Sequence, residues 1–188
     1  MEKLVKLFEH VSRHKEPEKI HRTPSGRTSR KGRALKDYLS HFVQVSDHKF
    51  LVLLYTGKFC TKLMYRALAH DFSKLFPDEA RGFSKSSRTF RKIPYGGTTY
   101  NRYLSHLGES LVFHYRRNKH HPQHYSDGVR GMDLLDLVEM FYDWAAASKR
   151  QSRGSLRSSI DKNTERFSIS EDLSRLLMNE RNRFRDKN

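Results

Sequence analysis

Side chains able to carry out chemistry are concentrated in three short strings in the middle of the chain, at 70–74, 114–124 and 139–143. All three strings contain histidine, aspartate or glutamate. Imidazole and carboxylate groups together suit divalent cations of the Zn, Mn, Fe, Co or Ni kind. A cation held in this way lowers the pKa of a bound water and polarises a phosphoryl oxygen. The strings therefore point to hydrolysis of a phosphate ester.

The spacing within the first and third strings supports this interpretation. Lys74 follows Asp71 by three residues, and its charge is well placed to meet a phosphate oxygen. Asp143 lies four residues after Glu139, so both carboxylates project from one face of a helix. The alternative is a structural helix that turns its acids to solvent. His48 lies on a helix expected before the first string.

The second string is the densest, with four histidines in eleven residues. Its candidate metal-binding or phosphate-binding side chains are His114, Arg116, Arg117, Asn118, His120 and His121. A solvated basic loop is the simplest alternative. A His-Asn-His nuclease, with a metal beside a histidine base on a hairpin and helix, is another. No hairpin pattern flanks the string, so we favour the phosphohydrolase.

Helical spacing of apolar residues predicts the elements that position these strings. We expect helices at 3–14, from 35, from an N-cap at Ser46 or Asp47, through 63–71, and at 99–117, 132–147 and from 170 onward. Residues 80–102 and 118–131 are predicted loops, and 149–168 is weakly patterned. No stretch alternates as a strand does, so the predicted fold class is all-α.

The expected organisation is one central domain with basic ends. Residues 1–34 form a basic helix and loop, 35–148 the metal-binding helical domain, and 149–188 a basic linker with a C-terminal helix. The 188 residues include 37 Lys or Arg and 21 Asp or Glu, a net charge of +16. This excess attracts polyanions such as nucleotides, nucleic acids or an anionic membrane surface.

Two further features bear on location. Cys60 is the single cysteine, so no internal disulfide forms, and we expect it to be a small buried side chain in a reducing setting. The longest apolar run, 50–55, is too short to cross a bilayer. We therefore expect a cytoplasmic protein without a membrane span.

The order His48, His70-Asp71, Asp143 resembles the H…HD…D pattern of HD-domain metal-dependent phosphohydrolases, an all-helical superfamily. The strings at 70–74 and 120–128 are similar to the His-Asp-x-Gly-Lys and His-His-Glu-x-x-Asp-Gly of its cyclic-dinucleotide phosphodiesterase branch. Ser73 and Gln123 replace the glycine and the glutamate. All three strings together resemble more closely a family of small phage and bacterial proteins, over roughly 48–150.

The HD resemblance implies a set of ligands. His48, His70, Asp71 and Asp143 would hold a first divalent ion, and His114 with His120 or His121 a second, with Asp71 bridging. Lys74, Arg116, Arg117 and Asn118 would bind phosphate. Glu79 or Glu139 would orient the attacking water, with Lys74 assisting. The cofactor is then one or two ions of Mn, Fe, Zn, Co or Ni, with Mg as a further candidate.

The expected substrate is a nucleotide-type phosphate ester, either a nucleoside monophosphate or a cyclic nucleotide. Two alternatives remain open. One is a basic nucleic-acid-binding protein that works through its arms at 15–34 and 149–188. The other is a metal-dependent nuclease, which would combine both features. The sequence leaves the oligomeric state open.

Overall fold

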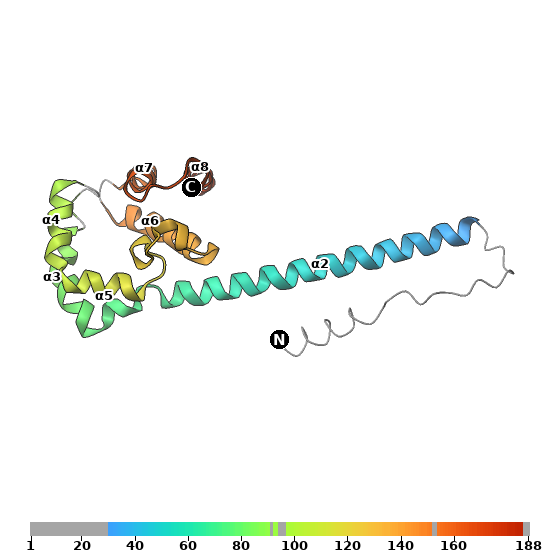
Figure 1. Cartoon of the computed structure of the whole chain (residues 1–188), viewed down its shortest axis with the longest axis horizontal. Helices are drawn as coiled ribbons and strands as arrows, with labels where there is room; N and C mark the ends of the chain where they lie inside the picture. The colour runs from blue at the N-terminus through green and yellow to red at the C-terminus, as the bar shows by residue number, and fades with distance from the viewer. Residues whose placement is uncertain (1–29, 91, 94–96, 152–153, 186–188) are drawn as a thin grey trace. The chain divides into compact units, whose positions relative to one another are not determined.

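The computed structural model is all-α (Figure 1). It describes residues 30–90, 92–93, 97–151 and 154–185, and no strand occurs among them. The predicted helix at 3–14 and nearly all of the basic segment 1–34 lie outside this range. By internal contacts the chain divides into two units, residues 1–51 and 52–188. None of the described helices has an apolar stretch long enough to cross a membrane.

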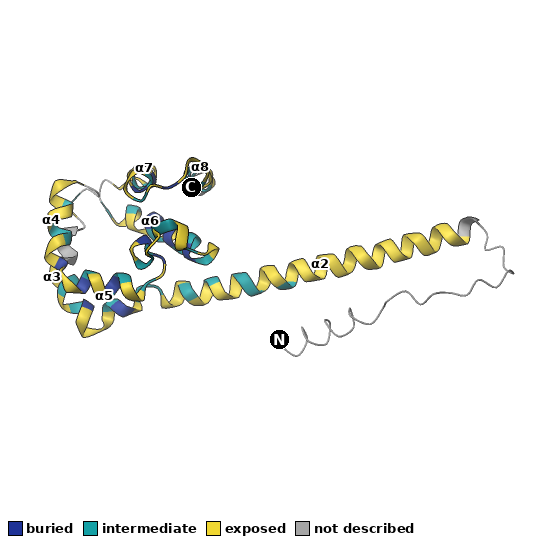
Figure 2. Ribbon diagram, viewed as in Figure 1, coloured by how far each residue is buried: buried dark blue, intermediate teal, exposed yellow. Residues whose placement is uncertain are grey.

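The longest element is α2, a single helix over Arg30–Ala69. The prediction of separate helices meeting at Ser46 or Asp47 was wrong. Those two polar residues sit within the helix, because α2 contains no proline and no residue that forces a turn. Figure 2 shows that α2 is exposed over most of its length. Cys60 on α2 is also exposed, which corrects the expectation that it is buried.

Helix α3, Pro77–Phe90, begins where the sequence suggested, with Pro77 at the first position and two acids in the first turn. It then continues through residues 80–90, about half of what was predicted to be a basic loop. Arg81, Lys85 and Arg88 in that part are good helix formers, so charge was a misleading sign of a loop there. Gly82 lets α3 approach the next helices closely, since a Cβ at this position would lie 2.6 Å from Ser110 Oγ.

The predicted helix at 99–117 is two helices, α4 over Thr98–Leu107 and α5 over Glu109–Arg117. Gly108 separates them with a φ of 49°, a conformation that glycine adopts readily. Helix α3 packs against both α4 and α5. The histidine-rich segment that follows is a loop, as predicted, with short 3₁₀ turns at Pro122–His124 and Gly128–Gly131.

Helix α6, Leu134–Arg150, begins with a capping box formed by Asp133 and Asp136. Beyond it lie α7, Leu156–Arg166, and α8, Glu171–Arg185, which pack as α6 on α7 and α7 on α8 (Figure 1). Sequence patterning missed α7. The main buried core joins these three helices through Met140, Phe141, Trp144, Ile160, Ile169 and Leu177. This packing fixes α6, which carries part of the candidate site.

Candidate metal centre

Four segments bring the candidate site together. His70 and Asp71 lie in the turn that follows α2, just before the 3₁₀ turn Phe72–Leu75. His114 lies in the last turn of α5, and His120 and His121 lie in the loop after it. Helix α6 contributes Glu139 and Asp143. All of these residues belong to the second unit, and His114 and His120 are buried.

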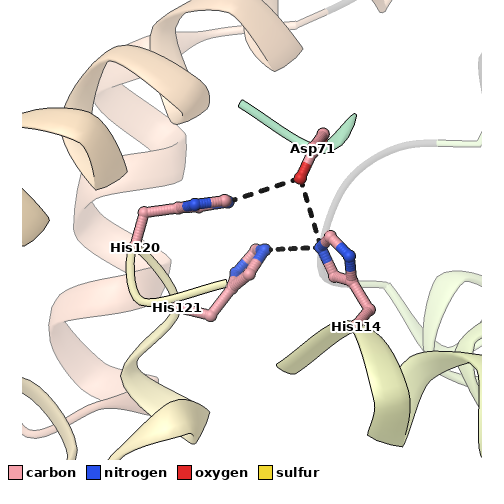
Figure 3. A group of neighbouring side chains, drawn as sticks. All are labelled: Asp71, His114, His120 and His121. Carbon is pink, nitrogen blue, oxygen red and sulfur yellow. Dashed lines mark hydrogen bonds and ion pairs between the residues drawn. The ribbon is translucent and has the colours of Figure 1, made fainter. Parts of the chain in front are cut away.

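Asp71 faces the rings of His114 and His120 (Figure 3). Its Oδ1 lies 3.4 Å from His114 Nε2 and 3.6 Å from His120 Nε2. The Nε2 atoms of His114 and His121 are 2.8 Å apart. Ligands held at about 2.0–2.1 Å by one tetrahedral ion are about 3.3 Å from one another. The four side chains therefore have separations close to those of a shared ion, and all four could bind it.

The second carboxylate oxygen of Asp71 faces a different group. His70 Nε2 lies 3.4 Å from Asp71 Oδ2 and 3.5 Å from Asp143 Oδ1, and these three side chains form a second set that could hold a metal. The two oxygens of Asp71 thus belong to two neighbouring sets of ligands. A carboxylate divided in this way is what two neighbouring ions require of a bridging ligand.

The backbone at Asp71 has an unusual conformation that directs its side chain. Its φ of 57° and ψ of 15° lie in the left-handed region, where Asp and Asn are more frequent than other non-glycine residues. This residue ends the path of α2 and turns the chain into the 3₁₀ turn at Phe72–Leu75. The turn presents His70 and Asp71 to α5, the loop and α6 at once.

Two carboxylates contact the Nδ1 atoms of the histidine rings, on the opposite side of each ring from Asp71. Glu79, fully buried, accepts a hydrogen bond at 2.9 Å from His114 Nδ1 and another at 3.0 Å from Ser73 Oγ. Glu139 Oε1 lies 2.9 Å from His70 Nδ1 and 3.1 Å from His120 Nδ1. With Nδ1 engaged, each of these rings presents its Nε2 to Asp71. Carboxylates in this position commonly orient metal-ligating histidines.

These contacts change the roles expected for the two glutamates, which were to orient the attacking water. Both carboxylates contact ring Nδ1 atoms instead, and Arg66 donates to the other oxygen of Glu139 at 2.7 Å. His70, His120 and Glu139 also lie close enough to hold an ion among themselves. Because Arg66 already neutralises Glu139, we assign Glu139, like Glu79, to positioning.

Two buried polar atoms at the centre lack a hydrogen-bond partner, namely Asp71 Oδ1 and His120 Nε2. They face each other across the 3.6 Å gap. A buried polar group without a partner costs about 1–3 kcal/mol, and proteins seldom retain one without a reason. A cation between the two atoms would satisfy both, so the donor set fits a divalent metal.

Most of the shifted pKa values favour the forms that bind metal. Burial would raise the pKa of Asp71, but the hydrogen bond with His70 and the charge of Lys74 lower it below its usual range. Burial and the charge of Lys74 lower the pKa of His114. Burial, with His120 and His114 nearby, lowers that of His121. At neutral pH the carboxylate is therefore charged and these two rings are neutral, as ligation requires.

His70 is the exception. Burial would lower its pKa, but hydrogen bonds to Asp143, Asp71 and Glu139 outweigh burial and raise it to about 11. Without a metal, the His70 ring is therefore protonated at neutral pH and shares its charge among three carboxylates. A divalent cation binding to this set takes the place of that proton.

Arg66 was missed by the sequence analysis. It lies on α2 four residues before His70, and it joins α2 to α6 through ion pairs with Asp136 at 2.6 Å and Glu139 at 2.7 Å. Tyr125 donates a hydrogen bond to the second oxygen of Asp136. The i, i+4 spacing of Arg66 and His70 was the signal that both would share one face.

Most of the residues predicted to bind phosphate contact other groups of the protein instead. Lys74 Nζ pairs with Asp71 Oδ2 at 2.5 Å, so it compensates the charge of the centre. Asn118 donates to Ser73 Oγ and to the carbonyl of His114, both at 2.8 Å, and so it fixes the loop. Arg116 is exposed, and Arg117 pairs with Asp78 at 3.2 Å.

The structure does not bring His48 into any of these sets. Its side chain is exposed on α2, in the first unit of the chain. The prediction placed His48 on a helix that precedes the one running into His70 and Asp71. Because α2 is one continuous helix, His48 lies within it and His70 lies in the turn just after its end. The remaining predicted ligands, His70, Asp71, His114, His120, His121 and Asp143, are brought together.

An open pocket of about 260 Å³ adjoins the centre. His70, His120 and Glu139 form one part of its lining, and Arg66, Arg117, Asn118 and Lys119 form another. Three of these side chains are cationic. The pocket thus combines groups of the candidate metal centre with positive charge, an arrangement that suits an anionic ligand.

Fold and site together define an all-α protein with a buried cluster of histidines and carboxylates. A family model matches residues 37–184 and is described as "Family of unknown function (DUF5662)". Because the match covers most of the chain, the protein belongs to this family. The matched range contains every residue of the cluster. Neither the curated proteins nor the solved structures contain a match to the chain.

Proposed function

We propose that the protein is a divalent-metal-dependent phosphohydrolase that acts on a nucleotide-type phosphate ester. The observation that carries the proposal is the position of Asp71, whose two oxygens face separate sets of histidine and carboxylate ligands. His114, His120 and His121 would hold one ion with Asp71, and His70 with Asp143 a neighbouring one. Such ions would supply a water activated at neutral pH and polarise the phosphoryl group.

The side chains around these ligands would do the remaining work. Glu79 and Glu139 fix the ring orientations, and Lys74 balances the negative charge of Asp71. Arg117 and Lys119, which line the pocket, would bind the non-reacting oxygens of the substrate phosphate. Lys119 is exposed and so can reach an incoming ligand. This pair replaces the larger set of phosphate-binding residues expected from the sequence.

The likeness to HD-domain enzymes supports the same class of reaction. His70-Asp71 and Asp143 supply the HD and the final D of that pattern. His48 is exposed and is in none of the ligand sets, so the first histidine of the pattern has no counterpart at this centre. We therefore propose an HD-like centre that uses the histidines of 114–121 as its additional ligands.

A nuclease is the second candidate, and the net charge of +16 favours it. A metal centre in a strongly basic protein would meet the phosphodiester backbone of a nucleic acid readily. The substrate screen should therefore include single-stranded and double-stranded nucleic acid beside small nucleotides.

The first test is the metal content of the purified protein, measured by elemental analysis. We expect about one or two equivalents of Mn, Fe, Zn, Co or Ni. Asp71→Asn should lose most of the metal yet remain helical, since asparagine also tolerates the left-handed conformation. His106→Ala is the matched control, because His106 is exposed on α4 and lies outside the ligand sets.

The second step is hydrolysis of nucleoside monophosphates, cyclic nucleotides and bis(p-nitrophenyl) phosphate with the metal found. Activity present in wild type and His106→Ala, and absent in Asp71→Asn, is the expected result. A protein that takes up none of these metals would refute the metal centre. One that binds metal but hydrolyses no ester would refute the hydrolase alone.

A further inference from the structure

Helix α2 displays a row of exposed apolar side chains that no described residue covers. Tyr38, Val45 and Val52 are 66%, 41% and 50% exposed. They are seven residues apart, so two helical turns bring each of them to nearly the same side of α2. Leu35 and Phe42, both exposed, flank this row. Rows of this kind on a surface usually mark a protein contact.

The row has a symmetry that points to its partner. Val45 lies midway between Tyr38 and Val52, and also midway between Leu35 and Tyr55. If a second α2 crosses in the opposite direction with Val45 against Val45, each of these residues meets an apolar residue of the other copy. A two-fold interface requires such self-complementarity, whereas a contact with an unrelated protein does not.

The area of this face is close to what a stable pair requires. An aromatic side chain buries about 150–250 Å² when fully covered. Tyr38, Phe42 and Tyr55 are each about three-fifths exposed, so they would contribute about 300–400 Å² per chain. Leu35, Val45 and Val52 are 59%, 41% and 50% exposed and add a smaller apolar area. Together these side chains supply a large part of the roughly 600–1,000 Å² per partner that a specific interface buries.

We propose that α2 is a dimerisation helix, which pairs antiparallel with α2 of a second copy about a two-fold axis through Val45. The inference does not depend on the metal centre or on the proposed activity. Burial of the apolar row would supply the stability that α2 lacks among the described residues.

The primary test is the molar mass of the full-length chain in solution, by sedimentation or light scattering. We expect twice the 22.3 kDa of one chain. Val45→Glu brings two like charges together at the axis and should weaken the dimer roughly 100-fold or more. Ser40→Glu is the control, since Ser40 is exposed on the far side of α2 and should leave the dimer intact. Circular dichroism checks that both variants remain helical.

A crosslinking experiment tests the direction. In a Cys60→Ser background, Tyr38→Cys and Val52→Cys chains are prepared separately and then mixed. The antiparallel pair predicts a disulfide between the two kinds of chain in the mixture, and little crosslinking in either chain alone. Crosslinking of each chain with itself would indicate a parallel pair and overturn the proposal.

Three further outcomes would also overturn it. A wild-type chain that stays monomeric at all concentrations has no second copy on this face. A chain that becomes dimeric only after removal of residues 1–29 covers the row with its own N-terminal segment. A dimer that Val45→Glu leaves unchanged uses another surface.

Discussion

Asp71 and the glutamates behind the histidines define the chemistry of the centre at the scale of single residues. The histidines differ in burial and in the direction of their pKa shifts, and only Asp71 belongs both to the set with His114, His120 and His121 and to the set with His70 and Asp143. Glu79 and Glu139 both contact ring Nδ1 atoms of these histidines. Their effect on activity should therefore pass through the metal.

The clearest residue-scale prediction concerns Glu79→Gln. The change removes the charge that holds His114 Nδ1–H but preserves the size of a fully buried side chain. We expect metal affinity to fall about 10–100-fold, as for other partners of metal-ligating histidines. Competition with a chelating dye measures it. Glu109→Gln, at an exposed position on α5, should have no effect.

A purely structural role for Glu79 would give a different pattern. The melting temperature of the metal-free protein would fall, while metal affinity at a temperature where the protein stays folded would remain that of wild type. Equal affinities in Glu79→Gln and Glu109→Gln would therefore argue against the positioning role.

At the scale of elements, Arg66 connects the end of α2 to the start of α6. It faces Asp136, whose side chain is 2% exposed, and Glu139, at 9%. Removing the guanidinium leaves two largely buried carboxylates without this cation. The loss of one partner of a buried ion pair typically destabilises a protein by about 3–5 kcal/mol. We predict that Arg66→Met lowers the free energy of unfolding of the metal-free protein by about this amount, measured with urea.

Lys62→Met is the matched control for this prediction. Lys62 is exposed one turn earlier on α2, and its replacement should change stability little. If Arg66→Met were as stable as Lys62→Met, the ion pairs would not be what holds α2 to α6.

The elements were partly predictable from the sequence. The all-α class, the start of α3 at Pro77 and the loop at 118–131 all followed from periodicity, proline and glycine. The runs that include Arg81 and Lys85, and the Ser- and Arg-rich stretch that contains α7, were misread. A helix that buries only a narrow face against its neighbours needs few apolar residues. The composition of such a helix therefore does not distinguish it from a loop.

The candidate site was predictable in its residue types but not in all of its geometry. The ligands from His70 to Asp143 were named from their clustering, and the structure brings them together. His48 was named from its place in the H…HD…D order, and the structure leaves it exposed on α2 and outside the ligand sets. The roles of Arg66 and Glu79 depend on contacts between segments far apart in sequence, which spacing within a segment cannot reveal.

At the scale of the whole molecule, the net charge of +16 should give the protein a general affinity for polyanions. We predict that binding to DNA or RNA, measured by fluorescence anisotropy, weakens steeply as salt rises, since association releases counterions. Asp71→Asn should bind as wild type does, because the charge excess lies elsewhere. A salt-independent affinity would point to recognition by shape or bases instead.

The left-handed backbone at Asp71 has a consequence for other members of the family. Only aspartate, asparagine and glycine adopt this conformation at little cost. Single-base changes convert an aspartate codon to one for asparagine or glycine, and both replacements would remove the carboxylate that faces the two ligand sets while sparing the turn. Evolution thus has a short route from this chain to relatives that keep the fold and lose the chemistry, and residue 71 is where such lineages would diverge.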